Sequence, residues 1–215
     1  MEYQNKTITL KDGRTALLRA VCKEDAIPMI AYMKACYEQT PYLMRYPDEF
    51  AVTAEQEATY LERQLVSPDV LMLVCEVEGK LAGNCQLDLN RWRKTRHRRQ
   101  VAIALLKDYW GLGIGTAMFE EMIDKARQEK LEQLELEVIE GNQRAIGLYH
   151  KMGFVCTGEK PNAIRLEDAT AMGMWLASSQ ASSSSSPGFL GTGFWNSSSA
   201  TRCRLSMMAL ASQSS

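Results

Sequence analysis

The sequence has no apolar run that approaches the roughly 20 residues a membrane-spanning helix needs. It shows no N-terminal signal peptide, and its six cysteines lie apart, without the CxxC or Cys/His spacing that binds metal. The net charge is only -1, which gives no general attraction to nucleic acid or to a membrane surface. These absences predict a cytoplasmic protein with reduced thiols, no metal, no membrane contact and no nucleic-acid partner.

The last part of the chain has arginine as its only type of charged residue. From Ala169 onward no Asp, Glu or Lys appears, and Ser182 to Ser186 form an unbroken serine run. We expect a globular domain at 1–176 and a low-complexity, Ser-rich tail at 177–215 that is disordered. Truncation after Ala177 should then leave stability nearly unchanged. A reading-frame shift, an artificial tail and an unusual natural linker are the alternative explanations for the change in composition.

The rest of the chain has a globular composition, 46% hydrophobic and 24% charged. Alternating and helical apolar patterns predict strands at 6–10, 16–20, 70–77, 81–89, 101–106 and 134–138, and helices at 25–37, from 53, at 114–130 and from 142. A further strand is expected from Phe154, paired with a final strand at 172–176. The 81–89 run alternates apolar with polar residues, which predicts one wetter face on this hairpin.

A glycine-rich stretch stands between a predicted strand and a predicted helix. Gly111, Gly113 and Gly115 follow the apolar run 101–106 and precede helical periodicity. Glycine allows a tight turn and close approach of a ligand, and the first free amides of a helix attract anions. No Lys follows the glycines as a Walker loop requires, and Thr116 stands where a dinucleotide fingerprint needs its third glycine. We therefore expect a pyrophosphate bound on the amides of residues 112–116.

Two motifs carry a resemblance to a known family. The core Trp110-Gly111-Leu112-Gly113-Ile114-Gly115 resembles the acetyl-CoA loop of the GNAT superfamily of N-acetyltransferases, with Trp110 in place of the usual Gln or Arg. The run from Asn142 to Phe154 looks like the family's N-x-x-A-x-x-L-Y-x-x-x-G-F motif. The resemblance covers roughly residues 7–168.

The resemblance implies an α/β (α+β) fold with a GNAT-like mixed, mostly antiparallel central sheet flanked by helices. It implies acetyl-CoA as the co-substrate and Tyr149 as the catalytic acid. The expected acetyl-CoA contacts are Leu105, Leu106, Gly111, Leu112, Gly113, Ile114, Gly115, Thr116, Asn142 and Ala145.

The expected reaction is direct transfer of the acetyl group, in a ternary complex, to a primary amine of a small molecule or of a peptide or protein N-terminus, by a monomer or homodimer. The alternatives are a non-catalytic acyl-CoA sensor on the same fold and a nucleic-acid module that uses the basic run 91–99. That run could also meet the phosphates of CoA or an acidic partner, but a solvated loop is favoured.

Proton transfer is the chemical demand of this reaction. A Lys-like amine, with a pKa of about 10.4, is almost wholly protonated at neutral pH, whereas an α-amine titrates at about 7.7 to 8.0. The departing thiolate needs a proton, and a Tyr hydroxyl is a competent donor. The family often places a Glu base in the strand before the loop, but Gln100 stands in the corresponding region. Glu137, His97 and an ordered water remain the candidate bases.

Overall fold

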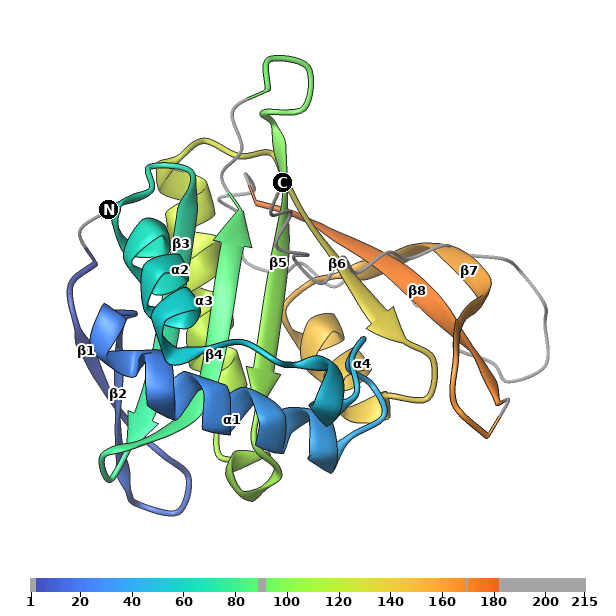
Figure 1. Ribbon diagram of the computed structural model, residues 1–215. Helices are drawn as coiled ribbons and strands as arrows, with labels where there is room; N and C mark the ends of the chain where they lie inside the picture. Colours follow the sequence, from blue (N-terminus) through green and yellow to red (C-terminus); the bar gives the residue numbers. More distant parts are fainter. Residues whose placement is uncertain (1–2, 89–91, 169, 182–215) are drawn as a thin grey trace.

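The computed structural model describes residues 3–88, 92–168 and 170–181 (Figure 1). The described strands are β1 Lys6–Thr9, β2 Thr15–Ala20, β3 Val70–Val77, β4 Lys80–Asp88, β5 Arg98–Leu105, β6 Gln133–Ile139, β7 Val155–Arg165 and β8 Ala171–Gln180. The described α-helices are α1 Ala26–Gln39, α2 Ala54–Val66, α3 Ile114–Gln128 and α4 Gln143–Lys151.

The strands form one eight-stranded sheet in the order β1-β2-β3-β4-β5-β6-β8-β7. All neighbours are antiparallel except β5 and β6, which are parallel. The predicted mixed, mostly antiparallel sheet is therefore confirmed.

The parallel strands β5 and β6 are paired only at their amino-terminal ends. Its register covers Arg98 to Gln100 on β5 and Gln133 to Glu135 on β6, and it goes no further. Toward their carboxyl ends the two strands diverge, as Figure 1 shows. Backbone groups that face the gap consequently have no partner strand, so polar main-chain atoms line an opening in the middle of the sheet.

Helices cover both faces of the β1–β5 part of the sheet. α1 and α2 lie on one face and enclose a core that includes Met72 and Val74, while α3 packs on the other face. α4 lies on the same side as α3 but beside β6 and β8, and the core on this side includes Leu73 and Leu134. The predicted wetter face of the β3–β4 hairpin is wrong for this reason. On β4, Gln86 is buried and Asn84 is half-buried, and the hydroxyl of Tyr32 lies 3.0 Å from Asn84 Oδ1.

The residues predicted to cap α2 and α4 do so in the structure. Thr53 and Gln56 form the expected reciprocal capping box at the start of α2. Asn142 caps α4 by accepting from the amide of Ala145 at 3.2 Å. Gly153, just after α4, has a φ of 85°, which is the left-handed backbone that glycine adopts without strain.

The last strand extends beyond the predicted domain boundary. β8 runs to Gln180 and inserts between β6 and β7, so it pairs on both sides. Residues 177–180 therefore belong to the sheet, and Ala181 is buried, with its amide donating to Glu132 O at 2.9 Å. The rest of the expected tail, residues 182–215, lies outside the described residues.

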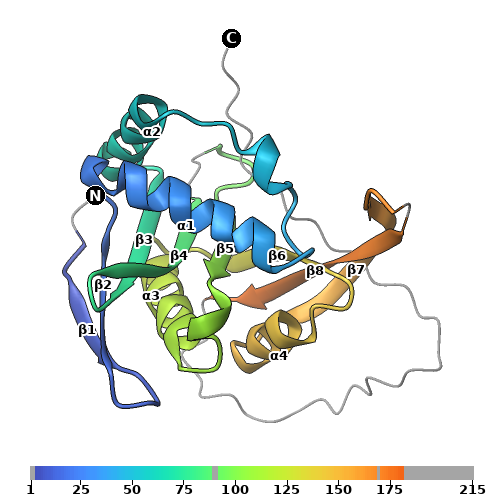
Figure 2. The same ribbon diagram turned by 60° about the horizontal axis from the view of Figure 1, so that its bottom comes forward.

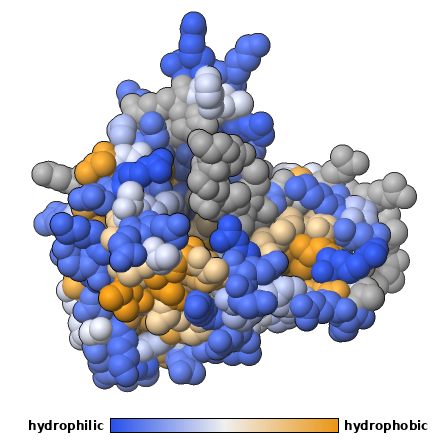
Figure 3. Space-filling model, in the orientation of Figure 1, coloured by the Kyte–Doolittle hydropathy of each residue, from blue (hydrophilic) through white to orange (hydrophobic). Residues whose placement is uncertain are grey.

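The basic run lies far from the glycine loop. Residues 92–97 form a turn that projects from the top of the molecule in Figure 1 and is strongly hydrophilic in Figure 3, and Arg98 and Arg99 already belong to β5. An eight-residue strand spans about 26 Å. The basic run and the glycine loop lie at opposite ends of β5, so the interpretation of this run as a contact for CoA phosphates at the loop is wrong. Arg91 lies outside the described residues.

Candidate active site

A cavity of about 370 Å³ lies where β5 and β6 diverge. Its walls come from the carboxyl ends of both strands, the glycine loop, the start of α3, one side of α4 and the connection after α1. Figure 2 looks at this end of the molecule and shows α3 and α4 side by side below the sheet. Elements far apart in the sequence thus converge on one opening.

The glycine loop forms the floor of the cavity. Gly111 and Gly113 have φ values of 79° and 102°, which only glycine adopts readily, and α3 begins at Ile114. As a helix start requires, the amides from Gly113 to Thr116 have no intrahelical acceptor, and no other acceptor for them lies within the described residues. A Cβ on Gly113 would point into open space. The arrangement is an anion cradle open to the cavity.

Cations surround this cradle. Lys11, Arg144 and Lys151 line the cavity, and the Lys151 ammonium donates to Thr116 Oγ1 at 3.1 Å. The backbone amide of Lys11 donates to Leu112 O at 3.1 Å, which fastens the β1–β2 turn to the loop. The loop and its cations together form a positively charged wall, suited to phosphate groups.

Tyr149 enters the cavity from α4. Its ring is held edge-on against Phe119, with centroids 5.5 Å apart, and lies 6.2 Å from Phe154. Although the residue is only 5% exposed, its hydroxyl makes no hydrogen bond within the described residues. Burial raises its pKa above the ordinary value, so the hydroxyl keeps its proton at neutral pH.

Glu137 enters the same cavity from the opposite face of the sheet. On β6, Leu136 and Val138 face the α3–α4 core, so Glu137 between them points to the other side. Its side chain is 1% exposed, and the Lys160 ammonium of β7 donates to its Oε1 at 3.2 Å. Burial raises the pKa of Glu137 to about 7, although Lys160 acts to lower it. A carboxylate with this pKa can accept a proton at neutral pH.

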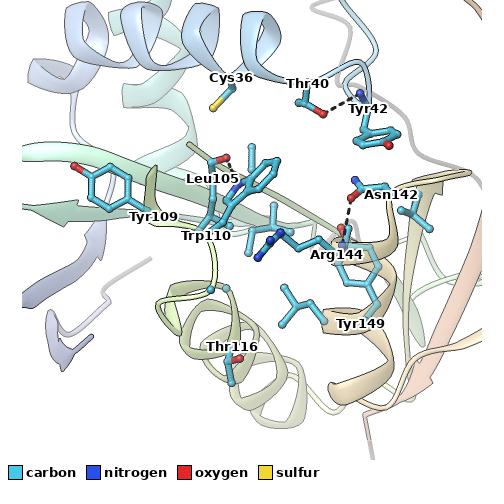
Figure 4. A pocket seen from close by; sticks show the side chains of 18 of the residues that line it. Cys36, Thr40, Tyr42, Leu105, Tyr109, Trp110, Thr116, Asn142, Arg144 and Tyr149 are labelled. Atoms are coloured by element: carbon cyan, nitrogen blue, oxygen red, sulfur yellow. Dashed lines mark hydrogen bonds between the residues drawn. The ribbon is translucent and has the colours of Figure 1, made fainter. Parts of the chain in front are cut away.

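The connection between α1 and α2 closes one side of the cavity. The Tyr42 hydroxyl donates to Gly141 O at 3.1 Å, and the amide of Glu167 donates to the Tyr46 hydroxyl at 2.9 Å. Figure 4 shows Tyr42 across the cavity from the glycine-loop side. These bonds join the α1 side to the β6–β8–β7 side across the gap.

The structure brings together most of the residues predicted for the site. The cavity is lined by Leu105, Gly111, Gly113, Gly115, Thr116, Asn142, Ala145 and Tyr149. Three predicted contacts do not line it with their side chains: Leu106 packs under α1, Leu112 packs against the main core, and Ile114 is fully buried in that core. Leu112 and Ile114 can still act through their backbone amides.

Among the candidate bases, only Glu137 lines the cavity, since His97 lies before β5 at the far end of the strand. Sequence reasoning missed Lys11, Tyr42 and Arg144 as lining residues. No local pattern marks Lys11 and Tyr42, but Arg144 stands inside the second motif, two residues after Asn142.

The sequence matches a known family of acetyltransferases. A family model described as "Acetyltransferase (GNAT) family" matches residues 33–154, more than half of the chain. The chain belongs to the GNAT acetyltransferase family and is an N-acetyltransferase.

Individual relatives agree with this assignment. The chain is 28% identical over 118 residues to the putative [ribosomal protein bS18]-alanine N-acetyltransferase of Bacillus subtilis, which covers 55% of this chain and 76% of that protein. The crystal structure of a GNAT-family acetyltransferase from Streptococcus pneumoniae superposes with a TM-score of 0.72 at 26% identity, over 77% of this chain and 99% of that one. The yncA structure from Salmonella typhimurium, which contains acetyl-CoA, shares the fold with a TM-score of 0.65 at 19% identity, over 79% and 96% of the chains.

None of the described helices has the length and apolar character needed to cross a bilayer. No group of three or more His, Cys, Asp or Glu side chains in the described part of the chain could hold a metal ion.

Proposed function

We propose that the protein transfers an acetyl group from acetyl-CoA to the α-amine of a peptide, a protein N-terminus or a small molecule, by direct attack in a ternary complex. The observation that carries the proposal is the placement of Glu137 and Tyr149 on opposite sides of one cavity, beside an open anion cradle. A base and an acid on opposite sides suit a reaction in which one proton leaves the nucleophile and another reaches the leaving group.

The residues present fit acetyl-CoA, which supplies an activated thioester carbonyl when bound. Unpaired amides from Gly113 to Thr116 fit its pyrophosphate, and backbone groups at the β5–β6 gap fit its amide-containing arm. Leu105 and Ala145 line the cavity beside these polar groups. The site therefore offers both an anion contact and main-chain hydrogen bonds.

Glu137 is the proposed general base. It faces the side of the sheet away from α4, where the acceptor amine would enter between β6 and the α1–α2 connection. In its ionised form it accepts the proton that the amine loses. Lys160 holds the carboxylate in place and favours this ionised form.

Tyr149 is the proposed general acid. Its protonated hydroxyl, held by the two phenylalanine rings, is free to donate a hydrogen bond to the departing sulfur. Because burial raises its pKa, complete transfer of the proton is uphill. The hydroxyl therefore donates a hydrogen bond to the sulfur as negative charge develops and keeps its own proton, and the departed thiolate takes its proton from water.

The pKa of the proposed base supports one class of acceptor. An α-amine near 7.7 to 8.0 differs by only about one pKa unit from Glu137 at about 7, whereas a Lys side chain differs by about three. The putative B. subtilis relative is described as acting on an alanine of a ribosomal protein, and the amine of alanine is an α-amine. Both points favour α-amines over side-chain amines.

An acetyl-CoA consumption assay tests the proposal. The released thiol would be followed with amino acids, alanine-initiated peptides, the same peptides with a blocked N-terminus, and polyamines. We expect turnover with free α-amines and none with blocked peptides. Turnover only with side-chain amines or polyamines would contradict the acceptor class, and binding without any turnover would favour the acyl-CoA sensor.

A further inference from the structure

Trp110 and Arg144 form a stacked pair at the glycine loop. The Arg144 guanidinium lies over the Trp110 ring, 5.2 Å from its centroid, and the Trp110 Nε1 donates to Leu105 O at 2.8 Å. Figure 4 shows the Arg144 side chain extending from α4 toward this ring. The indole is anchored to the end of β5, so it provides a fixed surface for the guanidinium.

The stacked guanidinium stands next to the loop. A Cβ on Gly111 would have Arg144 Nη1 as its nearest neighbour, at 3.7 Å, and both Trp110 and Arg144 line the cavity. Within the described residues Arg144 forms no ion pair with a carboxylate, and its side chain contacts the Trp110 ring. Its hydrogen-bonding fork is therefore available to a ligand on the cradle.

The stability of α4 does not explain why an arginine occupies position 144. It is the second residue of α4, and a cation in the first turn of a helix is unfavourable because of the helix dipole. Arg144 is also exposed, so it contributes little packing. A cation kept at an unfavourable position and held by an aromatic ring indicates a binding role.

We propose that Arg144, positioned by Trp110, contacts the pyrophosphate of acetyl-CoA and completes the anion cradle of the glycine loop. This inference rests on the proposed function, because it needs acetyl-CoA on that cradle. Guanidinium groups bind phosphate oxygens in a bidentate manner that an ammonium does not reproduce. Arg144 is the binding residue in this arrangement, and Trp110 is a positioning residue.

Calorimetric binding measurements on the full chain test the proposal with acetyl-CoA, 3′-dephospho-acetyl-CoA and S-acetylpantetheine. Arg144→Gln should weaken the first two equally, by roughly ten- to a hundredfold, and leave the third unchanged. Arg144→Lys should restore only part of the affinity. A loss seen with acetyl-CoA but not with the dephospho compound would move the contact to the 3′-phosphate and overturn the proposal.

Trp110→Leu should weaken acetyl-CoA binding by roughly two- to fivefold in the wild-type background and have no further effect in the Arg144→Gln background. Equal effects in both backgrounds would refute the positioning role.

Lys107→Gln is the matched control. Lys107 also lies near the Trp110 ring, 6.0 Å from its centroid, but does not line the cavity, so this variant should bind as the wild type does. Equal loss in Lys107→Gln would mean that general charge, not the Arg144 contact, sets the affinity. If the wild-type chain fails to bind acetyl-CoA, the proposed function itself is wrong. If it binds and Arg144→Gln binds equally well, only the present inference is wrong.

Discussion

Replacing Glu137 with Gln should remove activity and at the same time stabilise the folded protein above neutral pH. The substitution keeps the shape of the side chain but removes its charge and its ability to accept a proton. If Glu137 is the base, kcat/KM should fall by roughly a hundred- to ten-thousandfold. The acidic limb of the wild-type pH–rate profile, with an apparent pKa near 7, should disappear with it.

The effect on stability follows from the same pKa. Glu137 has a pKa of about 7 in the folded chain against an ordinary 4.5, a difference worth about 3 kcal/mol. Below pH 4.5 the carboxyl is protonated in both the folded and the unfolded chain, so its raised pKa does not lower the free energy of unfolding. Between pH 4.5 and 7 Glu137 ionises in the unfolded chain but not yet in the folded chain, so the free energy of unfolding of the wild type falls. Above pH 7 the full loss of about 3 kcal/mol is present.

Glu137→Gln should therefore match the wild type near pH 4 and exceed its free energy of unfolding by up to about 3 kcal/mol at pH 8. Denaturant unfolding at both pH values measures this. Glu135→Gln is the control: the residue lies on the same strand, accepts from Arg98 at 3.0 Å and does not line the cavity. An acidic limb that persists in Glu137→Gln, or a variant no more stable than the wild type at pH 8, would refute the assignment of a buried base.

Three other changes test the site and the fold. Tyr149→Phe removes only the hydroxyl, so turnover should fall by roughly a hundred- to ten-thousandfold with acetyl-CoA affinity near normal, and unchanged turnover where chemistry is rate-limiting would reject the acid. Gly113→Val places a branched side chain in the cavity at a φ of 102°, and a folded variant with wild-type acetyl-CoA affinity would disprove the cradle. Truncation after Ala177 removes strand pairing on both sides of β8, so the melting temperature should fall by about 2 to 4 °C for each kcal/mol lost, whereas truncation after Ala181 should leave it unchanged. Equal melting temperatures for the two truncations would show that the end of β8 adds no stability.

The end of the folded domain was predicted wrongly from the sequence, because β8 continues beyond Ala177 to Gln180. The composition changes at Ala169, and the serines that follow resemble a linker. In the structure Ser178 pairs with both Glu135 and Val155, because β8 fills a space between two strands. A central position in a sheet supplies hydrogen bonds on both sides, which compensates for weak strand propensity.

Features that depend on near neighbours could be predicted from the sequence. The capping box at Thr53, the cap at Asn142 and the glycine turn before α3 each need only a few consecutive residues, so their patterns are visible in the chain. The two motifs were enough to predict the family and the position of Tyr149 for the same reason.

Which side chains meet in the cavity could be seen only in the folded chain. Glu137 was one of several candidate bases in the sequence, and only burial in the folded chain raises its pKa to about 7, against the opposing effect of Lys160, 23 residues away. Arg144 became a candidate ligand only because α4 places it over Trp110. Burial and long-range contacts set the charge state and direction of a side chain, and both arise from packing between segments that no local pattern relates.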